Sequence, residues 1–459
     1  MRPRLRELTL AVLLLATSVN AKEVVRTHGV VLELSGFYKG LLSGVLLQPD
    51  SVTSSRSLLT LLDEARGAPG ATTIPEGGFL SAHVFRVNSR VRFDDRVQLD
   101  VAWQLALSLA SDPLLAGTTS LSTTVGGTGS GAQRRLVEGA GTLASGSSWR
   151  MEHNLDRLAL KVALPFGDLT VGRQVLSWGT GRFWNPTDVL SPFPPTVIDR
   201  EVRRGFDAVR MAIALGEVTQ LDVLYLPQLK PEDMGGVVRF QTNVKGWDGS
   251  VSAGKYVGDL VFGADVVGDL GPVGVHAEGA YTVPLVGLGT NTVTIGEHFF
   301  RGVIGGEVKP HEKVVLMAEY SFNGAGTNRP SEYAKVLSSP RYLRGELFGA
   351  SKHQAAVAAS FVASDLVSTS LAALGNLSDP SVMIIPSLEY SFTQTVLIRA
   401  GAYVPIGRTP DPQHYAALTV DDVRTNSEAF QTAIATRGLR SEYGAGSDGA
   451  FVQVGVYVP

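Results

Sequence analysis

Long segments of this sequence alternate strictly between two kinds of residue. In the clearest one, 97–110, every second residue is valine, leucine or tryptophan, and glutamine, aspartate, serine or alanine occupy the positions between them. Successive side chains of a β-strand point to opposite faces, so a strand keeps this pattern over fourteen residues and a helix does not. The segment 79–93 alternates in the same way, which predicts a hairpin with its turn at 94–96.

The length of the alternating segments separates two kinds of β-protein. Strands of soluble sheets average about five or six residues, whereas a tilted strand that crosses a membrane needs about nine to eleven. Many segments here reach ten residues, and short links alternate with long ones at 47–78, 111–148, 179–205, 323–352 and 405–448. Short turns at one end and long loops at the other are typical of bacterial outer-membrane barrels.

The sequence therefore predicts an all-β fold, a transmembrane antiparallel β-barrel of about 18 strands, with about 16 as the alternative. An even number puts both chain ends at the same side of the barrel. The strand assignment is weakest from 236 to 268, because all the links between the expected strands there are short. The expected strands cover 28–46, 79–93, 97–110, 150–164, 169–178, 206–215, 218–226, 236–244, 248–257, 260–268, 273–283, 299–308, 314–322, 353–363, 366–376, 381–392, 395–404 and 449–458.

The first residues carry an export signal. Three arginines precede a short apolar run at 8–16, and the small residues Val19 and Ala21 follow it. This order is typical of a secretory signal peptide, here 1–21, with cleavage after Ala21. We expect the remainder, 22–459, to form a single barrel in the cell outer membrane.

The composition excludes several classes of function. Lysine and arginine number 40 against 43 aspartate and glutamate, so no basic excess is available for binding nucleic acid. The chain has no cysteine, which excludes disulfides and thiol chemistry. None of the eight histidines has a metal-binding spacing, and no phosphate-binding loop occurs. We expect neither a metal nor a cofactor.

The polar face of the strands is expected to line the barrel interior, since the apolar face meets lipid. Strands in the first half are mostly basic there, and strands from 260 to 392 are mostly acidic, apart from Arg301. Opposite walls would then carry opposite charge and favour polar solutes. The alternative is that the charges pair and fill the interior. The expected pore-lining residues are Arg86, Arg90, Arg92, Asp100, Arg157, Lys161, Arg210, Arg239, Asp265, Glu278, Glu307, Glu319, Glu389 and Arg399.

The stretch from 172 to 210 is the most distinctive. It contains GRQ at 172–174, SWG at 177–179, NPTDV at 185–189 and a proline-rich run at 192–195. Its prolines stiffen the chain and its aromatic rings need a packing surface. We expect a loop near 179–205 to fold inward and constrict the pore; the alternatives are that it fastens the rim or binds a sugar. The expected constriction residues are Trp178, Trp184, Asn185, Asp188, Asp199, Glu201, Arg203 and Arg204.

Over roughly 40 residues this stretch resembles a broad group of proteobacterial porin-like outer-membrane barrels that carry a GRQ…SWG…NPTDV motif. In size and charge layout the chain is more distantly similar to alginate-export and polysaccharide-export barrels. The first resemblance implies a channel for hydrophilic solutes. The second implies an export conduit working with periplasmic export proteins. Either would contact outer-membrane lipid, lipopolysaccharide and the barrel assembly machinery, although Pro459 is not the usual aromatic terminus of such barrels.

A third reading, from a different class, is a hydrolase at the barrel rim. Ser81 and His83 share one strand face, and Glu152 and His153 lie near the same end of another strand. A serine, a histidine and an acid can form a catalytic triad. We expect these residues to be polar residues of the rim, and the protein not to be an enzyme. The oligomeric state is not determined by any pattern in the sequence.

Overall fold

The computed structural model describes residues 25–27, 29–70, 75–112, 135–197, 201–290 and 292–458. The expected signal peptide, 1–21, lies outside these residues. The strands of the ring, all antiparallel to their neighbours, are β2 (Val30–Leu46), β3 (Gly77–Arg92), β4 (Val97–Ala110), β6 (Trp149–Leu164), β7 (Gly167–Gln174), β8 (Phe206–Ala214), β9 (Gln220–Leu226), β10 (Gly235–Val244), β11 (Trp247–Tyr256), β12 (Asp259–Leu270), β13 (Val273–Val286), β15 (Phe299–His311), β16 (Val314–Asn323), β17 (His353–Ser364), β18 (Val367–Asn376), β19 (Ser381–Ser391), β20 (Val396–Ile406) and β21 (Asp448–Val458).

These 18 strands close into a barrel. Each pairs with the next along the chain, and β2 pairs with β21 from Gly36 opposite Val458 to Leu46 opposite Asp448. The expected number of 18 is therefore confirmed, including the weak part from 236 to 268, where β10, β11 and β12 pair in full register. Closure leaves no strand edge of the ring unpaired, which a barrel in lipid requires.

Three short strands extend single hairpins. β1 (Val25–Thr27) pairs with β2, β5 (Ala140–Ser145) with β6, and β14 (Thr294–Ile295) with β13. β5 is placed where β7 ends. The expected strand 169–178 stops at Gln174 because the chain then leaves the wall, and β5 covers the edge of β6 that β7 no longer reaches.

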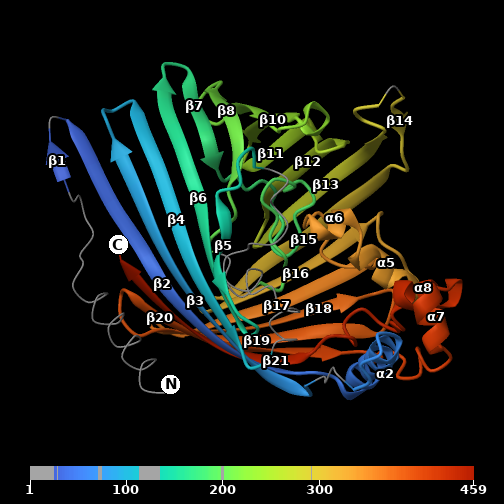
Figure 1. The fold of residues 1–459 in the computed structure, drawn as a ribbon. Coiled ribbons are helices and arrows are strands. Elements are labelled where there is room, and N and C mark those ends of the chain that lie inside the picture. Colours follow the sequence, from blue (N-terminus) through green and yellow to red (C-terminus); the bar gives the residue numbers. More distant parts are fainter. Residues whose placement is uncertain are drawn as a thin grey trace.

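The two ends of the barrel differ. Links of a few residues, such as 93–96 and 165–166, join the strands at the short-turn end. Apart from the short links 257–258 and 377–380, longer loops join them at the opposite, long-loop end, where α2, α7 and α8 lie together (Figure 1). The helices of the long loops are α2 (Pro49–Ala65), η2 (Pro231–Asp233), η3 (Pro330–Glu332), α5 (Tyr333–Leu337), α6 (Pro340–Leu343), α7 (Val420–Thr425) and α8 (Glu428–Thr436). Among the described residues, no helix has the length and apolar character needed to cross a membrane.

The two faces of the wall differ as alternation predicts. Leu42, Phe262 and Ile304 on the outer face expose about half of their surface or more, at 54%, 49% and 61%. Lys39 and Asp156 on the inner face are buried, with 0% and 1% exposed. A barrel that exposes a belt of leucine, valine and phenylalanine is suited to an apolar surrounding, since such a surface in water costs free energy.

Candidate functional site

The loop between β7 and β8, residues 175–205, is called the crossing loop. It contacts β13 and β16 through Glu278 and Glu319, and it contacts β2 and β20 through Lys39 and Arg399. In the order of the ring, β2 and β13 lie on nearly opposite sides. One loop reaches both sides only by running through the interior, so the crossing loop spans the barrel from within.

Glu278 of β13 binds the first half of the crossing loop. Its Oε2 accepts from the backbone N–H of Thr180 at 2.8 Å, and its Oε1 accepts from the N–H and the hydroxyl of Thr187 at 2.6 and 2.7 Å. Gly179 has φ +95°, and a Cβ there would lie 2.6 Å from Glu278 Oε2. Only glycine fits this backbone and this approach. The glycine of the SWG motif thus allows the loop to wrap around the carboxylate.

Glu319 of β16 is the second anchor. Its two oxygens accept from the backbone N–H groups of Arg182, Phe183 and Trp184 at 2.7, 3.1 and 2.8 Å. His276 Nε2 lies 3.0 Å from Oε2 on the remaining side. Successive backbone N–H groups that converge on one carboxylate form an anion-binding concavity. The barrel wall supplies the anion and the loop supplies the concavity.

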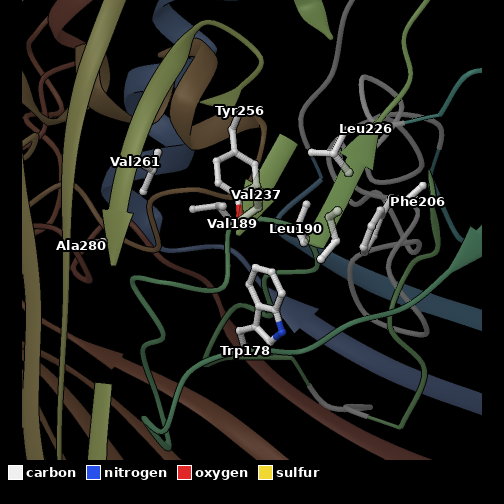
Figure 2. Packing of buried hydrophobic residues seen from close by; sticks show 11 residues of the cluster. Trp178, Val189, Leu190, Phe206, Leu226, Val237, Tyr256, Val261 and Ala280 are labelled. Atoms are coloured by element: carbon white, nitrogen blue, oxygen red, sulfur yellow. The ribbon is translucent and has the colours of Figure 1, made fainter. Parts of the chain in front are cut away.

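Apolar packing also holds the loop against the wall, in a cluster on β8 to β13 (Figure 2) and in a second cluster on β15 to β18. Trp178, Val189 and Leu190 of the crossing loop pack against the inner faces of β8 to β13, where Phe206 and Tyr256 are buried. Phe183 and Trp184 pack against β15 to β18 in a second cluster. Apart from buried polar anchors such as Glu278 and Glu319, the inner wall is thus largely apolar at these two clusters, which departs from the expectation of a uniformly polar inner face. The reason is that the loop removes this surface from water.

The second half of the loop is fixed by charge. Glu201 accepts from Lys39 Nζ at 2.7 Å, from Arg399 Nη2 at 3.0 Å and from the hydroxyl of Tyr457 at 2.8 Å. Within the loop, Arg203 pairs with Asp188. The three partners of Glu201 lie on β2, β20 and β21, on the side of the barrel opposite Glu278. Of the remaining expected constriction residues, Arg204 pairs with Glu138 at 3.5 Å, the Asn185 carbonyl accepts from the Asp188 N–H at 3.1 Å, and Asp199 lies outside the described residues.

The expected basic wall does not carry unpaired charge where the structure describes it. A carboxylate on the same strand, or one or two strands away, faces each of its cations. The pairs are Arg86–Asp156 at 2.8 Å, Arg90–Asp100 at 2.9 Å, Arg92–Glu33, Arg157–Asp156, Lys161–Asp168 at 2.9 Å, Arg210–Asp222 at 2.7 Å and Arg239–Asp265 at 3.5 Å.

The expected acidic wall needs a correction. Glu278 and Glu319 are 5% and 4% exposed and lie beneath the crossing loop, so they do not line an open lumen. Glu307 pairs with Arg182 of the loop at 3.1 Å, and Glu389 pairs with Arg399 at 2.7 Å. Arg301 donates to the carbonyl of Glu346 at 2.6 Å. Two opposite charges that lie close together largely cancel each other's field at longer distances. These local pairs therefore remove most of the electric field that was expected between opposite walls.

Sequence reasoning missed Asp156, and the cause is a β-bulge. The pairing of β4 with β6 shifts between Ala102 and Trp103, so that Leu155 pairs with Trp103 and Arg157 with Ala102. Asp156 is the extra residue, and it turns inward beside Arg157. Strict alternation places neighbouring residues on opposite faces, and a bulge breaks that rule. Glu33, Lys39 and Asp222 alternate normally and were detectable as inward polar positions.

The described residues line two cavities along the wall of β2 to β6. One, of about 390 Å³, is bounded by β2, β3, β6, β21 and the end of the loop, with Arg86, Arg157 and Glu201 among its lining residues. The other, of about 570 Å³, lies at the short-turn end and is lined by Arg92, Lys161 and the turn between β3 and β4. Both of these cavities lie at the wall of β2 to β6, on the side away from Glu278.

Two long loops, 324–352 and 407–447, meet the short link 377–380 in a polar cluster at the long-loop end. Tyr333 of α5 donates to Asp379 at 2.7 Å, and the side-chain amide of Asn376 donates to both Asp379 and Glu442 at 2.8 Å. Glu442 also accepts from the backbone N–H of Ala350 at 2.6 Å. Burial, together with the nearby carboxylate of Asp379, raises the pKa of Glu442 to about 7.

This pKa predicts that the polar cluster weakens as pH rises. A freely exposed Glu442 loses its proton near 4.5, whereas in the cluster it keeps the proton to about 7. The cluster therefore gains stability from the retained proton at low pH and loses it as pH rises through 7. Backbone amide exchange in 438–446, corrected for its intrinsic pH dependence, should be faster at pH above 7 than near 5. Glu442→Gln should abolish the difference; an unchanged difference in that variant would contradict the assignment.

Among the described residues, no carboxylate completes a catalytic triad with Ser81 and His83, as the hypothesis of a rim hydrolase requires. Ser81 Oγ lies 3.1 Å from His83 Nε2, but the group at His83 Nδ1 is the hydroxyl of Tyr38, at 2.7 Å. Glu152 pairs in register with Ala106 and forms an ion pair with Arg150 at 3.7 Å on the inner face. Among the described residues, Ser81 and His83 thus have a tyrosine, and no carboxylate, as the third hydrogen-bonded group.

The closed antiparallel ring of 18 strands with a loop across its interior defines the class of this fold, a porin-like β-barrel. No family model matches the chain, and neither does any curated protein searched.

Solved structures of similar outline include two Acinetobacter baumannii proteins. OccAB1 has a TM-score of 0.49 and 10% identity, with 96% of this chain and 99% of that chain covered. OccAB4 has a TM-score of 0.48 and 8% identity, with 93% and 97% covered. A Salmonella typhi OmpF in complex with daunomycin has a TM-score of 0.40 and 9% identity, with 94% and 99% covered. The class rests on the strand pairing described above and not on these likenesses.

Proposed function

We propose that this protein is an outer-membrane channel through which hydrophilic solutes diffuse. The observation that carries the proposal is the pair of cavities along β2 to β6, both bounded by charged side chains, one at the short-turn end and one beside the end of the crossing loop. A closed ring of this size encloses a water-filled lumen unless something fills it. The crossing loop packs against the inner faces of β8 to β13 and β15 to β18, so it would narrow such a lumen from that side.

The orientation follows from the same architecture. Barrels of this class turn their short turns to the periplasm and their long loops outward. The short-turn end with Arg92 and Lys161 would then face the periplasm, and the cluster around Glu442 would face the exterior. The apolar outer face would contact lipid and lipopolysaccharide after export and cleavage at Ala21, which amino-terminal sequencing of the mature protein tests.

Conductance in planar bilayers tests the channel. The purified protein should carry a stepwise ion current in KCl, and deletion of residues 180–203 should raise the conductance of each step, because the loop occupies part of the lumen. A deletion of comparable length in the 407–447 loop is the control for nonspecific damage. Absence of current from both the wild-type protein and the 180–203 deletion would refute the proposal.

A further inference from the structure

The outer face of the barrel carries an apolar groove of about 500 Å³ across β12, β13, β15 and β16. Its floor is made of small residues. Ala264 pairs with Gly279, Gly279 pairs with Gly302, and Ala277 lies in the next row of pairs. The larger outward side chains around this floor are those of Val266, Phe300, Ile304, Tyr320 and Phe322. A patch of small residues bordered by large ones leaves a depression in the wall.

Two glycines let the ring of Phe300 lie close to the backbone. A Cβ at Gly302 would lie 2.6 Å from Phe300 Cε1, and a Cβ at Gly279 would lie 2.9 Å from Phe300 Cε2. The ring reaches this position only because neither residue has a side chain. It also stacks on Phe322, with the ring centroids 6.4 Å apart. The groove is therefore bounded by aromatic carbon and by the strands themselves.

Few hydrogen-bonding groups of the described residues face the groove. Asp265 and Glu278 border it, but their side chains face the interior, where Asp265 pairs with Arg239 and Glu278 holds the crossing loop. On the outer face, the hydroxyl of Tyr320 is already hydrogen-bonded to His353 Nδ1 at 2.7 Å. A peptide or a sugar would leave its own polar groups without partners here, which costs free energy. A hydrocarbon chain has no such groups.

The groove lies in the half of the wall that is nearer to the long-loop end. β15 begins at this end with Phe299, and β16 ends there with Asn323, just beyond Phe322. The ring of Tyr281 lies 5.6 Å from that of His298 at the same end. Aromatic residues gather at the membrane–water interfaces of barrels. In the orientation proposed above, this half of the wall faces the outer leaflet, whose lipid is lipopolysaccharide.

We propose that this groove binds one acyl chain of a lipopolysaccharide molecule in the outer leaflet. The inference rests on the membrane location and orientation of the proposed channel, and it adds a lipid site that conduction does not require. Within a bilayer, close van der Waals packing drives association, and small residues let a partner approach the backbone. An acyl chain in the groove would contact the backbone of β13 and β15 as well as the flanking rings.

Photo-cross-linking in the intact outer membrane identifies the occupant. Ile304, at the edge of the groove and 61% exposed, is replaced by p-benzoylphenylalanine, which bonds to neighbouring C–H groups on irradiation. The cross-linked product should carry lipopolysaccharide, detected by an antibody against its core sugars. The same replacement at Phe361, near the short-turn end of β17, should give phospholipid products. Phospholipid products at Ile304, or a cross-linked dimer of this chain, would overturn the proposal.

A bulky residue in the groove tests the site itself. Ala264→Phe fills the floor, and Ala450→Phe, on the outer face of β21 in the same half of the wall, is the matched control. Each methylene group that loses an apolar contact weakens binding by a factor of about four. Displacement of two should therefore lower the lipopolysaccharide retained per barrel in mild detergent by about tenfold in Ala264→Phe. Equal retention in the two variants, both folded by circular dichroism, would contradict the site.

Failure of the lipid site is distinguishable from failure of the channel. A wild-type protein that conducts KCl but gives no lipopolysaccharide product at Ile304 overturns the lipid site and leaves the channel standing. A protein that carries no current but gives that product, and loses lipopolysaccharide on Ala264→Phe, refutes the channel and retains the lipid site.

Discussion

The double variant Glu278→Gln with Glu319→Gln should conduct about threefold more current than the wild-type protein, or more, since the lumen of such a barrel is wide once its loop is released. Both carboxylates hold the crossing loop by accepting backbone N–H groups between Thr180 and Thr187. Hydrogen bonds to a charged group are worth about 1.5–3 kcal/mol each, roughly twice a neutral one. Glutamine is neutral and offers one acceptor oxygen, so most of this attachment is lost.

The measurement is single-channel conductance, together with limited proteolysis of the crossing loop. Glu307→Gln is the matched control, because the contact of Glu307 with the described part of the loop is an ion pair with the half-exposed side chain of Arg182. That variant should differ little from the wild-type protein, since exposed ion pairs contribute little. Unchanged conductance and unchanged protease resistance in the double variant would contradict the anchoring role of the two glutamates.

A disulfide between the loop and the wall should reverse this opening. A Cβ built at Gly263 of β12 lies 3.5 Å from Thr187 Cβ, which is within the range of disulfide-bonded cysteines. The chain has no other cysteine to compete. Thr187→Cys with Gly263→Cys, introduced into the double variant, should return the conductance to about the wild-type level when oxidised. The hydroxyl of Ser252 must rotate away from the new side chain.

Reduction should restore the high conductance in the same membrane, so each channel serves as its own control. The single Thr187→Cys change in the double variant should stay open under both conditions. An oxidised, cross-linked protein that still conducts as the released variant does would show that the crossing loop is not the element that narrows the passage.

The architecture was largely predictable because a barrel repeats one local rule. Alternation gave the segment 97–110 with the bounds of β4, and β13 and β18 differ from expectation by three residues or fewer. The expected strand 169–178 was wrong at its end, since β7 stops at Gln174. The residues after Gln174 keep an apolar pattern, but they leave the wall. Trp178 packs against the inner faces of β8 to β13 instead of extending β7.

The candidate site was less predictable. The sequence indicated a stiff aromatic loop, but it assigned Glu278 and Glu319 to an open wall, where they instead hold that loop. Asp156 was missed because a bulge turns it inward. Such assignments depend on which residues meet across the barrel, at separations of 90 or more positions in the chain, and local patterns carry no such information.

The alternating faces, the number of strands and the unequal ends were determined by the sequence, because each depends on neighbours within a few residues. The partners of the charges were decided only by the closed ring. Closure brings β2 and β13 to opposite sides of one interior and lets a single loop touch both. Each buried carboxylate then accepts hydrogen bonds from the donors that lie nearest to it, backbone N–H groups as well as arginines. The reason is that burying a charge without hydrogen-bond or ionic partners costs a large amount of free energy.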